Sequence, residues 1–554
     1  MSTKFPEYKG LNLPNVAKEM LKYWEENNIF EKSVTTREGN KPYVFFEGPP
    51  SANGLPGVHH VLARAIKDIC PRYKTMKGFQ VKRKAGWDTH GLPIELGVEK
   101  ELGITKEDIG KTISVEEYNA ACRKAVMRYT GIWNDLTQKM GYWVNMDDPY
   151  VTYEPKYMES VWWLLKQIYE KNLMYKGYTI QPYSPKAGTG LSSHELNQPG
   201  TYQDVTDTTV VAQFKAINET LPSFLQNEGA VYFLAWTTTP WTLPSNTALT
   251  VGSKIEYVLV DTFNQYTFEP TKVILAKKLV GKQFGGKNTI EVDTTEELKE
   301  YTSGNKKIPF YVVKEFVGKD LVGIRYEQLL QYVLPNDNPQ DAFRIISGDF
   351  VTTEDGTGIV HTSPTFGADD ALVAKQATPE IPPMLIKDEN DNLVPLVDLQ
   401  GKFVKELGEF GGKYVKNEYY KDGEAPEKSI DVELAIKLKE ENKAFKVEKY
   451  KHSYPNCWRT DKPILYYPLD SWFIKVTDVK DRMHELNKTI NWKPVSTGEG
   501  RFGNWLANAN DWNLSRSRYW GIPLPIWRTE DKKEEICIGS VAELKAEIQK
   551  SVEA

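Results

Sequence analysis

YVFFEGPPSANGLPGVHHVLARAI, residues 43–66, joins three kinds of local sequence. Residues 43–47 are typical of a short buried strand, a loop of Gly, Pro and small residues follows, and the apolar residues after His60 have helical spacing. A strand, a glycine-rich turn and a helix in this order open a nucleotide-binding α/β unit, whose helix N-terminus presents free backbone N–H groups to phosphate. The His60 imidazole could add a further donor. Taken alone, the segment is equally compatible with an ordinary structural loop.

KAGWDTHGLPIE, residues 84–95, continues the same unit after a second predicted strand. Asp88, His90 and Glu95 then lie at the C-terminal end of that strand, where open α/β sheets bind their ligands. The Asp88 carboxylate could hold an ammonium group through a charge-assisted hydrogen bond. It could equally cap the helix that follows, and the residues themselves leave both roles open.

Helices and strands alternate over the first part of the chain, which predicts a parallel sheet. We expect an N-terminal helix at residues 13–29 and a helix after His60 that Pro71 kinks or ends. We also expect one long helix over residues 114–140. Ser114 and Glu117 have capping-box spacing at its start.

From about residue 201 the pattern changes to short runs of β-forming residues, which indicates a mainly β barrel or sandwich. The runs lie at residues 209–214, 230–237, 255–260, 272–278, 308–316, 343–348 and 358–362. Helical, aromatic-rich sequence returns after about residue 431. The predicted fold class is α/β, a Rossmann-like parallel-sheet nucleotide-binding domain with an inserted mainly β domain.

The composition limits the classes of function. The chain has 554 residues, enough for three or more domains, a net charge of −5, and no apolar run long enough to span a membrane. Its four cysteines form no CxxC pair, which favours a reducing cytoplasm and argues against zinc. Bulk charge does not indicate a nucleic-acid partner, and the basic run at residues 72–84 fits either a nucleic-acid patch or a solvated surface.

These motifs together resemble the class I aminoacyl-tRNA synthetases, from about residue 10 to about residue 530. PPSANGLPGVHH stands where that family has its HIGH signature, and GWDTHGLPIE is similar to the next motif of isoleucine enzymes. Valine enzymes have a GTDHAGIATQ-like segment there and leucine enzymes a GWDAFGLPAE-like one. The resemblance also includes LSSHELNQPGTYQDV, AWTTTPWTLPSNTAL, GTGIVHTSPTFGADD and LSRSRYWGIPLPIW.

The resemblance implies activation of isoleucine with ATP and Mg²⁺ to isoleucyl-adenylate, followed by transfer to tRNA(Ile). Such an enzyme acts by positioning and charge stabilisation, without a covalent intermediate. The resemblance assigns Asp88 to the isoleucine ammonium group, and Pro49 and Pro50 to the floor of the side-chain pocket. The expected ATP-binding residues are Gly48, Pro50, Asn53, Gly54 and His60, and the expected catalytic residues are Gly57, His59 and His60.

The signature departs from the family at two positions. Gly57 stands at the place of the family's first histidine, and His59 at the place of its glycine. We expect His59 to turn toward the phosphates and replace the missing imidazole, with ATP in a shifted pose. Inhibitors that span the isoleucine and ATP sites should then bind poorly. A decayed, weakly catalytic site is the alternative.

The β module, expected at residues 196–430, resembles the editing domain of the isoleucine, valine and leucine enzymes. One methylene is too small a difference for a single binding site to reject valine, an argument established for these enzymes. The resemblance assigns Thr237, Thr238 and Thr239, with Asn246 nearby, to the terminal ribose or a water. It assigns His361 to the valine side chain or a water, and Asp370 to the ammonium group of the misattached amino acid. Without the resemblance, three consecutive threonines are plain β-forming residues.

The rest of the chain is expected to form the catalytic domain. Residues 1–195 should hold the N-terminal helix and the first half of this domain, and residues 431–554 its second part. One feature of the family is missing from it. No KMSKS-like loop occurs, so we expect an N-terminal portion whose adenylation is feeble.

The cysteine pairs that bind zinc in many relatives are also missing, since Ser184, Ala187 and Thr460 stand in their place beside a lone Cys457. One thiol cannot form a tetrahedral zinc site, so we expect no metal in this chain. We also expect a cytoplasmic monomer with no membrane partner. A free-standing aminoacyl-tRNA editing hydrolase, a non-catalytic RNA-binding paralogue and a valyl-tRNA synthetase remain open alternatives.

Overall fold

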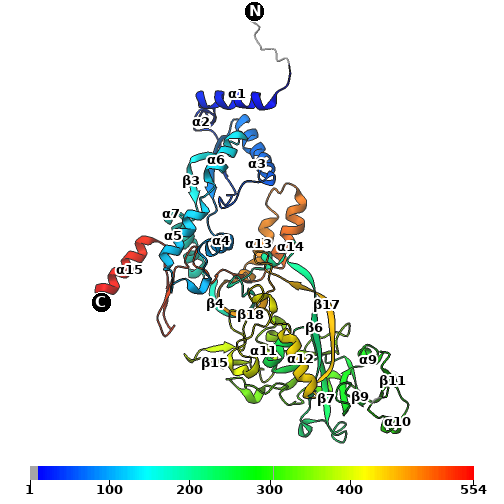
Figure 1. Cartoon of the computed structure of the whole chain (residues 1–554). Coiled ribbons are helices and arrows are strands. Elements are labelled where there is room, and N and C mark those ends of the chain that lie inside the picture. Colours follow the sequence, from blue (N-terminus) through cyan, green and yellow to red (C-terminus); the bar gives the residue numbers. More distant parts are fainter. Residues whose placement is uncertain (1–9, 304, 554) are drawn as a thin grey trace, which may run out of the picture. The chain divides into compact units, whose positions relative to one another are not determined.

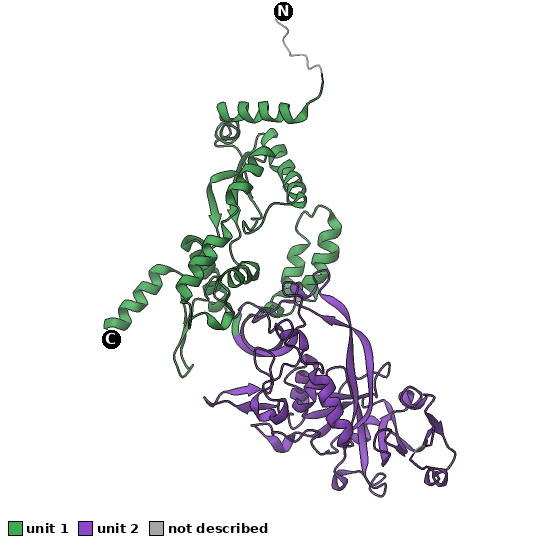
Figure 2. Ribbon diagram, in the orientation of Figure 1, with its two compact units in different colours: residues 1–175, 474–512, 518–554 green, residues 176–473, 513–517 purple. Residues whose placement is uncertain are grey.

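The computed structural model describes residues 10–303 and 305–553 and contains two compact units (Figures 1 and 2). Unit 1 takes residues up to 175, residues 474–512 and residues from 518 onward, and unit 2 takes residues 176–473 and 513–517. The chain leaves unit 1, forms most of unit 2 and returns, as expected for an α/β domain that carries an insertion. The three domain boundaries expected from the sequence stay predictions, because compactness alone does not identify a domain.

Unit 1 is built mainly of helices around a small sheet (Figure 2). Its elements are α1 Leu13–Glu26, α2 Ile29–Thr35, β1 Pro42–Phe46, α3 Val58–Met76, β2 Gln80–Trp87, α4 Leu92–Leu102, α5 Val115–Val126, α6 Thr130–Lys139, β3 Asn145–Val151, α7 Pro155–Glu170, α13 Lys480–Asn487, α14 Gly503–Ala507, β20 Ile526–Arg528, β21 Glu535–Cys537 and α15 Val541–Glu553.

The parallel sheet predicted for the nucleotide-binding part is confirmed. β1, β2 and β3 pair in this order and run parallel, with Tyr43 opposite Val81. Parallel strands end at the same edge of a sheet, so the loop between β1 and α3 and the loop between β2 and α4 meet at one edge. These loops are GPPSANGLPG and DTHG, the two segments that the sequence singles out.

The helix after the first loop continues through its proline. α3 does not end at Pro71 but runs on to Met76, so of the two expected effects of the proline the ending of the helix is excluded. Proline removes one backbone hydrogen bond from a helix interior. Pro71 lies on the buried face of α3 together with Arg64, Asp68 and Thr75, and the Thr75 hydroxyl donates to the Pro71 carbonyl at 2.9 Å. Packing of this face holds the helix together across the proline.

The predicted long helix over residues 114–140 is wrong in its length. The capping box at its start is present, since the Ser114 hydroxyl accepts from Glu117 N at 3.1 Å. However, α5 ends at Val126 and α6 begins at Thr130. Tyr129 N, at the break, donates to the Ala52 carbonyl at 3.0 Å. This long-range bond turns the chain toward the first loop, and helical periodicity cannot reveal it.

Unit 2 contains most of the strands (Figure 1). Its strands are β4 Met174–Ser184, β5 Thr189–Gly190, β6 Tyr202–Lys215, β7 Val231–Thr237, β8 Ala248–Val251, β9 Glu256–Phe263, β10 Pro270–Ala276, β11 Thr289–Glu291, β12 Ile308–Val317, β13 Arg344–Ser347, β14 Ile359–Thr362, β15 Leu385–Lys387, β16 Leu393–Pro395, β17 Ala444–Pro455, β18 Leu465–Ile474 and β19 Trp512–Asn513, of which β4, β18 and β19 have one or two residues in unit 1. Its helices are α8 Ser193–Leu196, α9 Val280–Phe284, α10 Thr295–Lys299, α11 Ala368–Gln376 and α12 Ile430–Glu440.

A ten-stranded mixed sheet organises unit 2. The order β11-β12-β9-β10-β7-β14-β8-β13 forms its main path, and β6 pairs with both β7 and β17. Each of the seven predicted runs coincides with one of its strands, so the mainly β character is confirmed. β17 was not anticipated, although it pairs with β6 along eleven register positions and lies beside it in Figure 1. Its polar residues, among them three lysines and one glutamate, obscure the strand in the sequence, because both of its faces are largely accessible.

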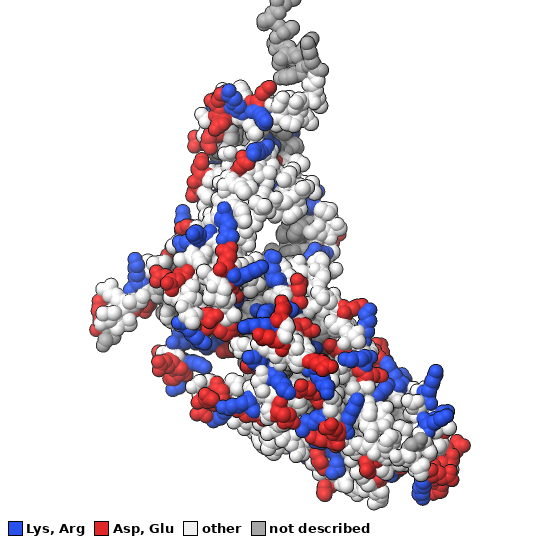
Figure 3. All heavy atoms as spheres, viewed as in Figure 1, with Lys and Arg blue, Asp and Glu red and all other residues white. Residues whose placement is uncertain are grey.

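Three of the six basic side chains at residues 72–84 form ion pairs with carboxylates of unit 1. Arg72 pairs with Asp68 and donates to the Gly141 carbonyl, and Arg83 is buried with its guanidinium 3.6 Å from Asp68. Lys84 pairs with Asp148 at 2.6 Å. Basic and acidic side chains are interspersed on the face that Figure 3 shows. Among the described residues no helix is long and apolar enough to cross a membrane.

Candidate functional site

Backbone hydrogen bonds join the two loops that the sequence predicts to form the active site. Asp88 N donates to the Pro50 carbonyl at 3.0 Å, and Glu47 N donates to the Lys84 carbonyl at 2.9 Å. The first bond places the GPP segment directly beside the GWD segment. Pro50, a predicted isoleucine-pocket and ATP-binding residue, is therefore adjacent to the predicted ammonium ligand Asp88.

The first loop is held in shape from α6. Trp133 Nε1 donates to the Gly54 carbonyl at 2.9 Å, and the Ser51 hydroxyl lies 3.0 Å from Asn53 Oδ1. Gly48 is exposed, whereas Pro49, Pro50, Asn53 and Gly54 are half-buried. The predicted nucleotide-binding residues therefore form a fixed loop that remains accessible to a ligand.

His60 closes the N-terminal turn of α3. Its Nδ1 accepts from Gly57 N at 2.9 Å, so the neutral ring carries its proton on Nε2. The ring packs edge-on against Trp133 with a centroid separation of 4.8 Å. Burial, with smaller effects of His59 and Arg64, lowers the pKa of His60 below its ordinary value. His60 is thus a neutral N–H donor at a helix N-terminus, a position that suits a phosphate.

His59 lies back against Gly57. A β-carbon on Gly57 would come within 2.7 Å of His59 Cε1 and 2.9 Å of its Nδ1. The Gly57 backbone has φ −105° and ψ 169°, an extended conformation open to every residue type. The backbone angles do not require glycine at residue 57, and a side chain there would only have to displace the exposed His59 ring. The exchange of the two signature positions is thus a linked pair, although no ligand reveals where the phosphates lie.

Asp88 lies at the open side of the second loop. Desolvation raises the pKa of its carboxyl, and the hydrogen bond from the His90 backbone N–H opposes that shift. It does not cap α4, whose N-cap is Gly91. His90 is half-buried, with its ring 5.3 Å from that of Trp520, and burial lowers its pKa to about 4. Within the described residues, His90 Nε2 is buried without a hydrogen-bond partner.

Sequence reasoning did not find the support beneath this loop. Glu95 is buried and accepts from Arg518 Nε at 2.9 Å and from Trp520 N at 3.0 Å. Trp520 Nε1 in turn donates to the Thr89 carbonyl at 2.6 Å. These bonds tie the RSRYWG segment to the Asp88 loop. The partners are more than 420 residues apart, so only charge complementarity could have hinted at the pair.

In unit 2 four of the predicted editing residues, Thr237, Thr239, Asn246 and His361, belong to one hydrogen-bonded group. His361, on β14, lies 2.8 Å from Asn246 Nδ2 and 3.0 Å from the hydroxyl of Thr242. Thr242 donates to the Thr239 carbonyl at 2.8 Å, and Thr239 N donates to the Thr237 hydroxyl at 3.1 Å. Thr238 is half-buried beside them. Thr242 belongs to the same site but was not predicted.

Asp370, in the first turn of α11, is linked to the same group. One of its carboxylate oxygens accepts from Ser363 N at 2.8 Å, two residues after His361. The ring of Phe366, between them, packs against Trp241 of the threonine segment with centroids 5.2 Å apart. Burial raises the pKa of Asp370 to about 6.

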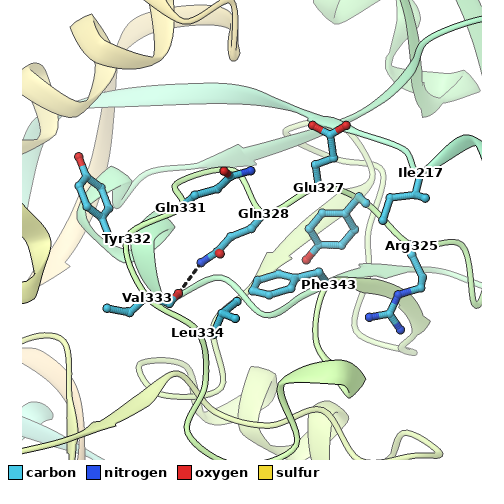
Figure 4. Close-up of a pocket in the computed structure, with 10 residues that line it drawn as sticks. Ile217, Arg325, Glu327, Gln328, Gln331, Tyr332, Val333, Leu334 and Phe343 are labelled. Atoms are coloured by element: carbon cyan, nitrogen blue, oxygen red, sulfur yellow. Dashed lines mark hydrogen bonds between the residues drawn. The ribbon is translucent and has the colours of Figure 1, made fainter.

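Unit 2 also contains a cavity of about 600 Å³ (Figure 4). None of the predicted editing residues lines it. Figure 4 shows Arg325 and Phe343 at one end and Gln328 bonded to the Val333 carbonyl. Tyr326, which also lines the cavity, donates its hydroxyl proton to Asn246 Oδ1 at 2.7 Å. Tyr326 therefore connects the cavity to the predicted editing residue Asn246.

The residues at the expected zinc positions do not fit a metal. The Ser184 hydroxyl accepts from Ala187 N at 3.1 Å, so it closes a turn, and the methyl group of Ala187 offers no ligand. Cys457 is buried. In residues 10–303 and 305–553 no group of three or more His, Cys, Asp or Glu is arranged to hold a metal ion.

Comparison with known proteins identifies the class. Residues 19–554 match the family model described as tRNA synthetases class I (I, L, M and V), and the chain belongs to this family. It is 63% identical over 556 residues to an isoleucine–tRNA ligase of Cytophaga hutchinsonii, covering 99% of this chain and 49% of the relative. It is 62% identical over 570 residues to an isoleucine–tRNA ligase of Bacteroides fragilis, covering 100% and 49%. The chain spans about half the length of these curated relatives.

A solved structure of Agrobacterium radiobacter LeuRS with tRNA and LeuAMS is also similar. It has a TM-score of 0.34 and 15% identity, and the match covers 96% of this chain and 52% of that one.

Proposed function

We propose that this chain carries the amino-acid and nucleotide sites of an isoleucine–tRNA ligase, which activates isoleucine with ATP and transfers it to tRNA(Ile). The hydrogen bond between Asp88 N and the Pro50 carbonyl carries the proposal, because it joins the isoleucine-type GWDTHGLPIE segment to the nucleotide loop. The identity to proteins named isoleucine–tRNA ligase supports the choice of amino acid.

The role proposed for each residue is the one that the family resemblance assigns, and the chemistry of the side chain agrees with it. The Asp88 carboxylate binds the isoleucine ammonium group, and Pro49 and Pro50 shape the pocket for its side chain. His60 donates from Nε2 to an ATP phosphate, beside free N–H groups at the start of α3. Gly48, Asn53 and Gly54 allow ATP to approach the loop. Mg²⁺, which accompanies ATP, neutralises phosphate charge.

Isoleucine-dependent exchange of pyrophosphate into ATP tests this proposal, measured on the longest natural protein that carries this sequence. We expect exchange with isoleucine, weaker exchange with valine, and loss of exchange in Asp88→Ala. Stronger exchange with valine would favour the valyl enzyme. No exchange with any amino acid would favour an editing hydrolase or a non-catalytic RNA-binding protein.

We further propose that unit 2 hydrolyses valine attached to tRNA(Ile). In this reaction Asp370 grips the valine ammonium group, the hydroxyls of Thr237, Thr238 and Thr239 hold the terminal ribose or a water, and Asn246 and His361 complete the site. The linked hydrogen bonds between β14 and the threonine segment support this assignment. Hydrolysis of Val-tRNA(Ile) by the 554-residue chain, with Ile-tRNA(Ile) as the control substrate, tests it. We place both reactions in a monomeric cytoplasmic enzyme.

A further inference from the structure

The orientation of the Asn246 side-chain amide is fixed by its surroundings. Its Nδ2 lies 2.8 Å from the Ala248 carbonyl, which can only accept, so the NH₂ end must face that carbonyl. Its Oδ1 accepts the hydroxyl proton of Tyr326 at 2.7 Å. The opposite orientation would place two oxygens against each other at Ala248 and would leave no acceptor for Tyr326.

This orientation determines the tautomer of His361. The second Nδ2 hydrogen of Asn246 points at His361 Nδ1, 2.8 Å away, so Nδ1 accepts and carries no proton. The neutral imidazole then carries its proton on Nε2 and donates it to the Thr242 hydroxyl oxygen at 3.0 Å. Thr242 donates onward to the Thr239 carbonyl. Every donor in the chain from Tyr326 to Thr239 points the same way.

Burial stabilises the neutral His361 tautomer that carries its proton on Nε2. The exposed fraction is 1% for Tyr326, 2% for Asn246 and 7% for His361. A proton on Nδ1 would set an N–H group against the Asn246 amide hydrogen, and no buried acceptor is at hand to compensate. Consistently, burial lowers the pKa of His361 to about 4.

We infer that Tyr326 and Asn246 are positioning residues that hold His361 as a neutral Nε2–H donor, so that His361 orients Thr242 and does not take a proton from the attacking water. The editing role of this inference rests on the proposed hydrolysis of valine products. The tautomer itself does not, because it follows from contacts within the free chain. A water at this site must be activated by a group other than His361.

Nitrogen NMR of the whole 554-residue chain, labelled with ¹⁵N-histidine, measures the tautomer without substrate. A His361→Gln variant assigns the signal. We expect an unprotonated Nδ1 and a protonated Nε2 that do not change between pH 5 and pH 8. The ring's hydrogen-bond partners among the described residues are the Asn246 amide and the Thr242 hydroxyl, neither of which titrates there. Asp370 of α11 is the ionisable group of the site that titrates within this window. A protonated Nδ1, or a ring that takes up a proton in this range, would overturn the inference.

Two variants test the positioning role. Asn246→Asp removes the donor that faces Nδ1 among the described residues, so the proton should move to Nδ1 and the hydroxyl of Thr242 should turn to donate to Nε2. Tyr326→Phe removes one of the two contacts that orient the amide, while the Ala248 carbonyl still holds its NH₂ end, so we expect a smaller shift toward the other tautomer. Tyr467→Phe is the matched control, because this buried tyrosine of unit 2 donates to the Val397 carbonyl, away from Asn246.

Hydrolysis of Val-tRNA(Ile) by the same proteins provides the second readout. We expect Asn246→Asp to slow it about 10- to 100-fold, by analogy with the partners that orient metal-binding histidines in other proteins. Tyr326→Phe should slow it less, and Tyr467→Phe should leave it unchanged. Full activity in Asn246→Asp with an inverted tautomer would overturn the positioning role. Absence of hydrolysis in the unmodified chain would overturn the proposed editing function, and the tautomer measurement would separate the two failures.

Discussion

The imidazole of His59 occupies the space in which a side chain at residue 57 would begin. A β-carbon on Gly57 would lie 2.7 Å from His59 Cε1, closer than real β-carbons approach other heavy atoms. The two positions of the signature that differ from the family are therefore physically coupled. A side chain at residue 57 therefore displaces the His59 ring from the position it has here.

Gly57→Ala should push the His59 ring away from the turn and lower isoleucine-dependent ATP–pyrophosphate exchange. Because His59 is exposed and its ring can rotate, we expect a loss of less than about 1 kcal/mol in the free energy of unfolding. In Gly57→Ala/His59→Gly the clash is absent. The relative exchange activity of this double variant should therefore exceed the product of the relative activities of Gly57→Ala and His59→Gly. The coupling measured by the double-mutant cycle should reach about 0.5–3 kcal/mol.

Full restoration of the family order, Gly57→His with His59→Gly, addresses the alternative of a decayed site. We expect the restored protein to exchange no better than the native one and to bind a bisubstrate inhibitor more tightly. Exchange by the restored protein alone would show that the native site has decayed.

Glu95→Ala should destabilise unit 1 strongly. It leaves Arg518 buried without one of its two carboxylates and removes the acceptor of Trp520 N, which typically costs about 3–5 kcal/mol. Urea unfolding followed by tryptophan fluorescence and by hydrogen exchange of the Asp88 loop measures the effect. Glu101→Ala is the control, because its ion pair with Arg128 is exposed and its loss should have little effect. Equal changes in the two variants would contradict the structural role of Glu95.

Local patterns predicted the features that depend on neighbouring residues. The alternation of apolar residues predicted the strands that carry Thr237 and His361, and Ser114 with Glu117 predicted a real capping box. Long-range contacts could not be predicted in this way. The link from Tyr326 through Asn246 to His361 spans 80 and 115 residues, and no period or spacing records it.

The departures from the expectations have the same origin. Pro71 was expected to kink the helix or to end it, and the packing that lets α3 run on to Met76 lies outside the local sequence. Apolar spacing continues from residue 114 to residue 140, yet the bond from Tyr129 N to Ala52 divides the helix. The identities of the site residues came from resemblance, and their tautomers, partners and burial came only from the structure.

Hydrolysis of Val-tRNA(Ile) should increase with pH through the titration of Asp370. Burial raises the pKa of this carboxyl to about 6, so the protonated form, which cannot pair with an ammonium group, predominates below pH 6. The rate constant, corrected for uncatalysed ester hydrolysis, should therefore rise between pH 5 and pH 7 with an apparent pKa near 6. Asp370→Asn should be slow and should lack this rise. A flat profile in the unmodified chain would contradict the assignment.

The free energy of unfolding should depend on pH in the opposite direction to the rate of hydrolysis. A carboxyl whose folded pKa exceeds its unfolded pKa takes up a proton more readily when folded, so Asp370 favours the folded state as the pH falls. Relative to Asp370→Asn, the unmodified chain should therefore lose stability between about pH 4 and pH 6 as the pH rises. Urea midpoints of the two proteins at matched pH values measure this difference, and a constant difference would show that Asp370 is not desolvated.

Ser363→Ala should separate ligand binding from stability. The Ser363 hydroxyl is buried and, among the described residues, has no hydrogen-bond partner, while its backbone N–H holds Asp370. Removing an unpaired buried hydroxyl loses no bond and relieves desolvation, so the free energy of unfolding should stay the same or rise by up to about 1 kcal/mol. The backbone N–H of Ser363 holds the carboxylate expected to bind the substrate ammonium group, so if the unpaired hydroxyl serves the ligand, hydrolysis of Val-tRNA(Ile) should slow. Thr362→Val is the matched control. It removes a hydroxyl that is bonded to Thr250 at 2.7 Å, so it should lower the free energy of unfolding. A destabilised Ser363→Ala protein with unchanged hydrolysis would show that the hydroxyl serves the fold and not the ligand.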